Sequence, residues 1–125
     1  MDAAGSLCRA LDMADMSSLS GHLDDKSLLH VPGLSGLGGD YQGREAIIGV
    51  LRRMAGATGG TLHFEANATD LSRRGVLRVT GRLSGTRDGR PIRVTVSLDA
   101  TLDGQVFRRI TIECADRPAW DALWG

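Results

Sequence analysis

The sequence lacks the features that mark most specialised classes of protein. Fifteen basic and fifteen acidic side chains leave no net charge, and no run of like charge gathers locally, so nucleic acid is disfavoured as a partner. The apolar runs are far shorter than the roughly 20 residues that span a bilayer. The two cysteines, Cys8 and Cys114, lie at opposite ends of the chain and fit neither a disulfide framework nor a metal site. We therefore expect a cytoplasmic protein with buried thiols and no membrane contact.

Patterns that bind metals and nucleotides are missing as well. His22, His30 and His63 lie on separate expected elements, without a pair on successive helical turns or a nearby cysteine. The glycines between Gly33 and Gly39 lack the lysine of a phosphate-binding loop. The sequence therefore predicts no metal and no cofactor.

The first half of the chain carries a helical period of apolar residues. This period predicts one helix from about residue 3, a short second helix over 19–23 and a third from about residue 43. Asp15 is positioned to cap the second helix. Between the second and third helices, residues 26–31 predict a short strand, and residues 33–40 predict a mobile, glycine-rich loop.

From about residue 61 the apolar residues alternate along four segments. Turn pairs such as Asp88-Gly89 predict that these segments form an antiparallel meander. One face, which includes Ala66 and Ala68, is apolar and must be covered by the helices. The other face carries arginine, threonine and acidic side chains. A last helix begins at Asp116, and the fold class is therefore α+β.

Three stretches carry a resemblance to a known family. They read His30-Val31-Pro32-Gly33, Leu37-Gly38-Gly39-Asp40-Tyr41-Gln42-Gly43-Arg44-Glu45-Ala46 and Trp120-Asp121-Ala122-Leu123-Trp124-Gly125. In this order of elements, nearly the whole chain resembles the SnoaL-like branch of the nuclear transport factor 2-like superfamily. The resemblance implies one domain over residues 1–125, in which a curved antiparallel sheet wraps around the helices as a cone. It also implies an apolar pocket for a hydrophobic small molecule, and often a homodimer through the outer face of the sheet.

The side chains expected to line that pocket are apolar and face inward. They are Leu11, Val31, Leu37, Ile47, Val50, Leu51, Met54, Phe64, Val79, Val96, Leu98, Ile110, Ile112 and Trp120. Val31 and Leu98 stand where the isomerases that resemble this chain carry their base and their acidic oxyanion donor. Apolar side chains at both positions argue against a ketosteroid isomerase mechanism.

Three residues are candidates for chemistry next to a carbonyl, which needs a base and a hydrogen-bond donor. Asp116 resembles the residue that begins the cyclases' catalytic segment, but it also suits the cap of a helix that starts with Arg117-Pro118. His30 is either a base or a hydrogen-bonded histidine at a strand end. Tyr41 either donates to an oxyanion or pins the glycine-rich loop. For each residue the structural role is favoured.

Two classes of function stay open, because the superfamily holds cyclases, isomerases and proteins without a catalytic role. The first is a cyclase or isomerase that acts by acid/base chemistry on a hydrophobic, carbonyl-bearing metabolite such as a polyketide or terpenoid. The second is a module without catalysis that binds a similar ligand or a protein partner.

The polar face of the meander is the expected dimer interface. Arginine there alternates with threonine, serine and an aspartate, a mixture that suits a close, hydrogen-bonded contact. Asp99 of one subunit would pair with Arg78, Arg82, Arg93 or Arg109 of the other. The alternative is a solvated face whose charges pair within one subunit.

Overall fold

The computed structural model describes residues 2–13, 15–33, 36–72 and 74–124. Its helices are α1 (Ala3–Met13), α2 (Ser17–Ser20), α3 (Arg44–Ala57) and α4 (Arg117–Trp124). Its strands are β1 (Leu28–Val31), β2 (Gly39–Gln42), β3 (His63–Leu71), β4 (Val76–Arg87), β5 (Arg90–Asp103) and β6 (Val106–Cys114). Residues 34 and 35 of the expected loop and Gly125 of the closing motif lie outside the described residues. No helix within the described ranges is long and apolar enough to cross a membrane.

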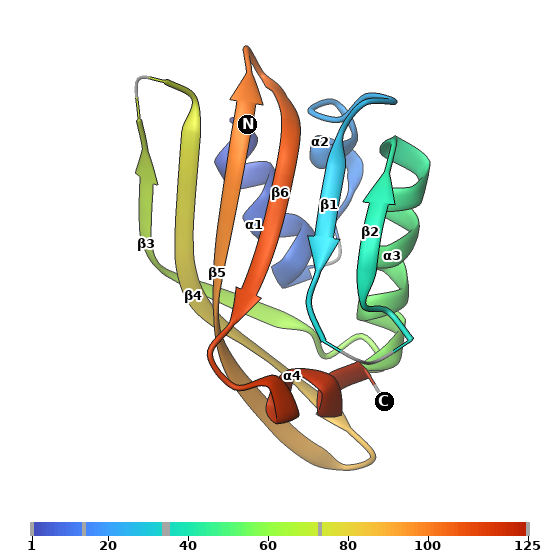
Figure 1. Ribbon diagram of the computed structural model, residues 1–125. Coiled ribbons are helices and arrows are strands. Elements are labelled where there is room, and N and C mark those ends of the chain that lie inside the picture. The colour runs from blue at the N-terminus through green and yellow to red at the C-terminus, as the bar shows by residue number, and fades with distance from the viewer. Residues whose placement is uncertain (1, 14, 34–35, 73, 125) are drawn as a thin grey trace.

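The strands form one sheet in the order β2-β1-β6-β5-β4-β3 (Figure 1). From β3 to β6, each strand pairs antiparallel with the next, which confirms the predicted meander. At the β4–β5 turn, Asp88 and Gly89 have φ values of 51° and 76°, as expected of a tight hairpin turn with two left-handed residues. The strand β1 pairs antiparallel with β2 but parallel with β6, so the sheet is mixed.

The strand β2 corrects the predicted glycine-rich loop. Gly39 and Asp40, expected in the loop, begin this strand, and the register places Asp40 opposite His30 and Tyr41 opposite Leu29. Glycine is depleted in strands, so the residues of this segment do not themselves favour an extended conformation. The segment is extended because it pairs with β1. The φ of Gly39 is 140°, a value that favours glycine.

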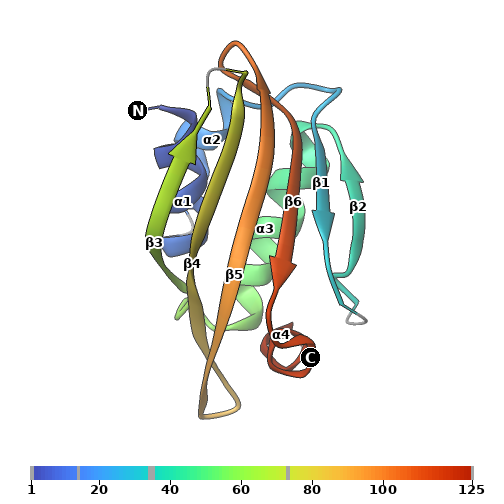
Figure 2. The same cartoon turned by 60° about the vertical axis from the view of Figure 1, so that its left-hand side comes forward.

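The core lies between the sheet and the helices α1 and α3, which cover the same face of it (Figure 2). The helix α3 buries Ile47, Val50, Leu51 and Met54, at the spacing of one helical face. The helix α4 lies across the end of the sheet, where β6 stops (Figure 1). The arrangement confirms an α+β fold in which a bent sheet encloses helices.

The edge strand β3 is less buried than its sequence predicts. Phe64 is buried, but Ala66 and Ala68, which were expected on the inner face, are exposed. The pairing with β4 shifts register between these two alanines. Because a β-bulge adds a residue to one strand, the simple alternation of inward and outward side chains ends there.

The helix α2 is shorter, and begins earlier, than the predicted 19–23. Asp15 nevertheless stabilises its start, because Asp15 Oδ1 accepts hydrogen bonds from Ser17 N at 3.2 Å and from Ser17 Oγ at 2.6 Å. The same hydrogen bonds hold the pKa of Asp15 below its ordinary value. The N-cap position itself is Met16, which makes no side-chain cap hydrogen bond, so Asp15 supports the start of the helix from one residue earlier than the sequence predicts.

The outer face of the sheet is polar, as the alternation predicts. Arg78, Arg93 and Arg109 are exposed on it, and Asp99 is half-buried among them. Asp99 Oδ1 lies 3.0 Å from Arg78 Nε of the same chain. Arg78 and Asp99 therefore pair within one subunit, as in the alternative to pairing across a dimer interface that the sequence left open. Such an exposed pair contributes about 0–1 kcal/mol to stability.

Candidate functional site

His30 and Asp40 form a hydrogen-bonded pair on the adjacent strands β1 and β2. The register places them opposite each other, with His30 Nδ1 at 2.7 Å from Asp40 Oδ1. An ionised carboxylate only accepts hydrogen bonds, so Nδ1 carries a proton, and in the neutral imidazole the lone pair is on Nε2. The side chains are 42% and 79% exposed. The pair therefore adds little to stability, but it fixes the orientation and tautomer of the imidazole.

A cavity of about 250 Å³ opens beside His30, and we call it the β1–β6 slot. The parallel pairing of β1 with β6 stops at His30 and Thr111, whereas β6 continues to Cys114. The slot is lined by His30, Pro32, Thr111, Ile112, Glu113, Cys114 and Arg117. Ligand pockets usually measure about 300–1,000 Å³. The slot therefore has room for one end of a ligand rather than for the whole of a large one.

A smaller hollow of about 120 Å³ borders the other side of His30, where Asp40 and Arg109 also line it. Leu29 and Val31, the neighbours of His30, are buried, so His30 faces away from the core. His30 thus lines both hollows while Asp40 holds its Nδ1.

Tyr41 holds the glycine-rich segment. Its hydroxyl donates a hydrogen bond to the carbonyl oxygen of Leu37 at 2.8 Å, and the guanidinium of Arg53 lies over its ring at 5.7 Å from the centroid. The hydroxyl proton is therefore engaged by the backbone. This is the pinning role that the sequence favoured for Tyr41.

Asp116 caps α4. Its Oδ1 accepts a hydrogen bond from the backbone N–H of Ala119 at 3.1 Å, and its side chain is exposed. Asp116 does not line the β1–β6 slot, although the adjacent Arg117 does. A cap of this kind contributes about 1 kcal/mol to stability. Asp116 thus lies next to a residue of the slot, and the role that the structure gives it is that of a helix cap.

The apolar side chains expected to line a pocket pack together in the core. All except Leu37 are buried, and Leu37 is partly buried against them. Ile112 reaches the slot. Trp120 is fully buried, and its Nε1 donates to the carbonyl oxygen of Pro32 at 2.8 Å. Their role as walls of a ligand pocket stays a prediction.

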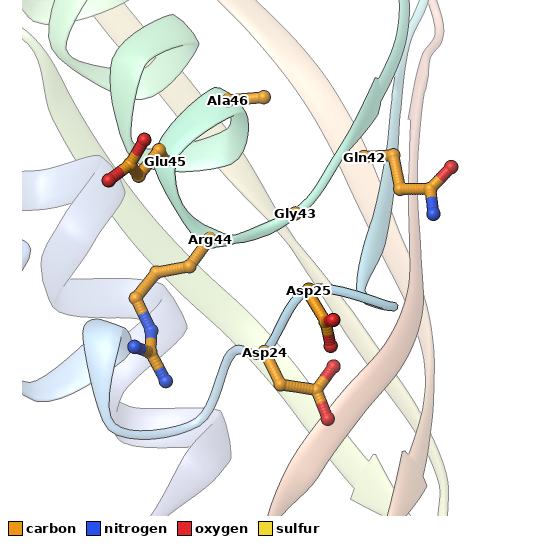
Figure 3. Close-up of a pocket in the computed structure, with 7 residues that line it drawn as sticks. All are labelled: Asp24, Asp25, Gln42, Gly43, Arg44, Glu45 and Ala46. Atoms are coloured by element: carbon orange, nitrogen blue, oxygen red, sulfur yellow. The ribbon is translucent and has the colours of Figure 1, made fainter.

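A polar cleft of about 880 Å³ lies at the start of α3, away from the predicted candidates (Figure 3). Its lining residues are Asp24, Asp25, Gln42, Gly43, Arg44, Glu45 and Ala46. Residues 42–46 belong to one of the stretches that carry the family resemblance, and we call them the signature stretch. Asp24 and Asp25 are not among the residues that the sequence predicts for a site. The adjacent acidic residues just before the first strand were the signal that could have drawn attention to them.

Asp24, Arg44 and the backbone N–H of Gly43 have structural partners in this cleft. Arg44 Nη2 donates to the carbonyl oxygen of Leu23 at 2.6 Å, and Gly43 N donates to Ser27 O at 2.8 Å. Arg108 Nη1 lies 3.0 Å from both carboxylate oxygens of Asp24. This contact holds the pKa of Asp24 below its ordinary value. The signature stretch therefore ties the loop before β1 to the start of α3.

The two thiols are poor nucleophiles. Both are half-buried, which corrects the expectation of buried thiols. Burial raises the pKa of Cys8, and the charges of Asp2 and Asp12 raise it further. Burial also raises the pKa of Cys114, against the opposing effect of Arg117. Because the thiolate is the reactive form, Cys114 does not supply a nucleophile to the slot at neutral pH.

Comparison with known proteins identifies the fold. No family model matches the sequence, and no curated protein is similar to it. Among solved structures, Bal32a from a soil-derived mobile gene cassette is 28% identical, with a TM-score of 0.88 and coverage of 98% of this chain and 95% of that one. A Xanthomonas campestris protein of unknown function with a cystatin-like fold is 21% identical, with a TM-score of 0.87 and coverage of 100% and 99%. TerC, co-crystallised with polyporic acid, is 16% identical, with a TM-score of 0.82 and coverage of 98% and 96%.

The chain has the nuclear transport factor 2-like fold, which is also called cystatin-like or ketosteroid isomerase-like. This confirms the fold that the resemblance implied. Other structures with this fold include a candidate polyketide cyclase from Sinorhizobium meliloti and a candidate isomerase from Rhodopseudomonas palustris. Proteins of unknown function share it too, so the fold by itself leaves the activity open.

Proposed function

We propose that this protein binds a small, hydrophobic, carbonyl-bearing molecule and acts on it by acid/base chemistry, as a cyclase or isomerase. The observation that carries this proposal is the His30–Asp40 pair, with 2.7 Å between Nδ1 and Oδ1, beside the β1–β6 slot. A base oriented by a carboxylate and open to a cavity is the arrangement that proton abstraction needs.

The proposed chemistry is a proton transfer next to the carbonyl group. His30 Nε2 takes a proton from the carbon beside the carbonyl, and the electron pair of the broken C–H bond forms an enolate. The imidazolium then returns the proton at another carbon, which completes an isomerisation. Alternatively, the enolate carbon attacks a second carbonyl carbon of the same molecule and closes a ring; the C=O π electrons pass to its oxygen, and the imidazolium gives its proton to that alkoxide. Asp40 stabilises the imidazolium, because its carboxylate accepts from Nδ1–H throughout.

Binding of a hydrophobic molecule is supported by the fold. The slot itself is lined mainly by polar surface, with Pro32 and Ile112 as its apolar part, and it would take the polar, carbonyl-bearing end of the molecule, with Arg117 as a cation for a polar substituent. The ligands of structures with this fold include polyporic acid, in TerC, and trimethylamine, in a Catenulispora acidiphila protein.

The proposed function predicts exchange of a carbon-bound proton. In D₂O at neutral pH, the protein should accelerate loss of the NMR signal from the protons beside the carbonyl of 1-tetralone or 1-indanone. General base catalysis typically contributes about 10²–10⁴-fold. If both ketones exchange only at the rate seen in buffer, the acid/base activity is refuted, and the second function, a binding module without catalysis, replaces it.

We further propose that the protein is a homodimer through the outer face of the sheet. Val76 is 46% exposed on the meander part of that face, and a mainly apolar hollow of about 170 Å³ lies beside Val76 and Asp99. Exposed apolar side chains among arginines and threonines suit the core and rim of an interface. The intrachain Arg78–Asp99 pair would then lie within the contact.

The dimer predicts a mass of twice the 13.3 kDa of the chain in light scattering coupled to size exclusion. Asp99→Arg should lower that mass to the monomer value, because it places like charges around Arg78 in the interface. Arg52→Glu, an exposed change on α3, should leave the dimer intact. A monomer mass for the unchanged protein refutes the dimer, and a dimer that survives Asp99→Arg refutes this face as its interface.

A further inference from the structure

The β1–β6 slot contains a cation as well as the histidine. Arg117 and His30 both line it, but they come from different elements, because His30 belongs to β1 and Arg117 is the first residue of α4. The charge of Arg117 lowers the pKa of the Cys114 thiol, against the larger effect of burial. Cys114 lines the slot too, so the guanidinium acts at the wall of this cavity.

The other side chains of the slot are poorer hydrogen-bond donors. Pro32 and Ile112 carry no polar side chain, the ionised carboxylate of Glu113 only accepts hydrogen bonds, and a thiol is a weak donor. Thr111 stands opposite His30 in the parallel pairing of β1 and β6, which places its hydroxyl beside the histidine rather than across the slot from it. The guanidinium is therefore the strongest donor that a ligand oxygen in the slot can meet.

Arg117 has no structural task that explains it. None of the ion pairs among the described residues includes Arg117. The start of α4 is capped by Asp116 instead. A cation at the first residue of a helix is unfavourable, because the N-terminal end of the helix dipole is positive. A residue that breaks a local rule of stability without a compensating contact is expected at a functional site.

We propose that Arg117 holds the carbonyl oxygen of the substrate and stabilises it as an enolate. This inference rests on the proposed function, and it assigns a residue to the oxygen that becomes charged. As His30 removes the proton, the electron pair of the C–H bond forms a C=C bond and the C=O π pair passes to the oxygen. A guanidinium N–H donates to this oxygen, and the hydrogen bond strengthens as negative charge develops. The slot should therefore prefer the enolate of a 1,3-diketone to a simple ketone.

The first test compares two ligands that have the same carbon skeleton. Dimedone, a cyclic 1,3-diketone, is largely an enolate anion near neutral pH, whereas 3,3-dimethylcyclohexanone is neutral. Arg117→Gln should weaken dimedone binding about tenfold in an NMR titration, because it removes a charge-assisted hydrogen bond. Its affinity for the neutral ketone should change by less than about twofold. Equal dimedone affinity in the variant and the unchanged protein, or no dimedone binding by the unchanged protein, overturns the inference.

Three further variants show whether the effect belongs to the slot. Arg52→Gln makes the same change of charge at an exposed position of α3 away from the slot, and should keep full dimedone affinity. Glu113→Gln should strengthen dimedone binding by about two- to fivefold, because it removes a carboxylate that repels the enolate. Arg109 lines the smaller hollow on the other side of His30. Loss of dimedone binding in Arg109→Gln, with full binding in Arg117→Gln, would place the oxygen in that hollow and overturn the assignment.

The second test follows proton exchange in 1-tetralone. Arg117→Gln should lower kcat by about 10–10²-fold, somewhat less than the loss of a donor from a water-excluded oxyanion hole, because Arg117 is exposed. KM should change little, since the contact is stronger in the transition state than with the neutral ketone. Arg117→Lys should recover part of the rate, because it keeps the charge without the planar fork. A higher KM with unchanged kcat would overturn the role at the enolate.

The third test separates this role from a structural one and from the proposed function. Arg117→Gln removes a cation from the start of α4, so Tm should rise or stay within about 3 °C of its value in the unchanged protein. A larger fall in Tm that accompanies the loss of dimedone binding would make that loss structural and overturn the inference. Dimedone binding that depends on Arg117, without exchange of the tetralone protons, means that the inference stands and the acid/base activity fails. Equal exchange and equal dimedone binding with and without Arg117 mean that the activity stands and the inference fails.

Discussion

Replacement of His30 by glutamine should lower the rate of proton exchange in 1-tetralone by about 10²–10⁴-fold, the usual contribution of a positioned general base. Glutamine keeps a hydrogen bond to Asp40, but its amide has no basic lone pair. The side chain of His30 is 42% exposed, so the free energy of unfolding should change by less than about 0.5 kcal/mol. Exchange is measured by NMR and stability by urea unfolding.

The chain supplies a matched control for this change. His63 and Asp12 form a second histidine–aspartate contact, between β3 and α1, with His63 59% exposed, and neither residue lines the slot. His63→Gln should therefore keep the full exchange rate. The exchange rate of Asp40→Asn should lie between those of the unchanged protein and of His30→Gln, since this change leaves the base in place without its carboxylate. Full exchange in His30→Gln, combined with loss in Asp116→Ala, would move the base to Asp116.

The sequence predicts the meander well because its signals are local. Alternation places Leu77 and Val79 in the core and Arg78 outside, and the Asp88-Gly89 turn fixes the hairpin register. The strand β2 gives no such signal. Its first residue is glycine, and only its pairing with β1 extends it, an interaction that a local pattern does not contain.

Because the sequence does not predict β2, only part of the candidate site could be predicted. The sequence singles out His30, but its partner Asp40 belongs to the segment interpreted as a loop. The two residues meet only because β1 and β2 pair in the observed register. Tyr41 and Asp116 have structural roles that the sequence could name, because their partners lie within four residues. The sequence does not predict that the buried Trp124 Nε1 has no hydrogen-bond partner among the described residues, since a missing acceptor is a property of the packed core.

The glycine within β4 is a residue whose presence the sequence alone does not explain. Gly81 occupies an inward-facing position between Val79 and Leu83, where a larger apolar residue would be expected, and glycine weakens a strand. The structure gives the reason. A Cβ atom at Gly81 would lie 2.4 Å from the carbonyl oxygen of Glu65 and 2.8 Å from Phe64 Cζ. The ring of Phe64, the buried residue of β3, therefore takes the space that a side chain at Gly81 would need.

Gly81→Ala should lower the free energy of unfolding by about 2 kcal/mol, the usual cost of overpacking a core, and Tm by about 6–12 °C. The contact with Glu65 is a backbone contact, so relief requires β3 to move away from β4 rather than a change of rotamer. Gly56→Ala is the matched control, because this position is exposed in α3 and a methyl group there would have no heavy atom within 4 Å; it should stabilise the protein by about 0.5–1 kcal/mol. Thermal and urea unfolding measure both variants. A Gly81→Ala protein as stable as the unchanged chain would show that the edge strand yields without cost, and that the ring of Phe64 is not what keeps this position glycine.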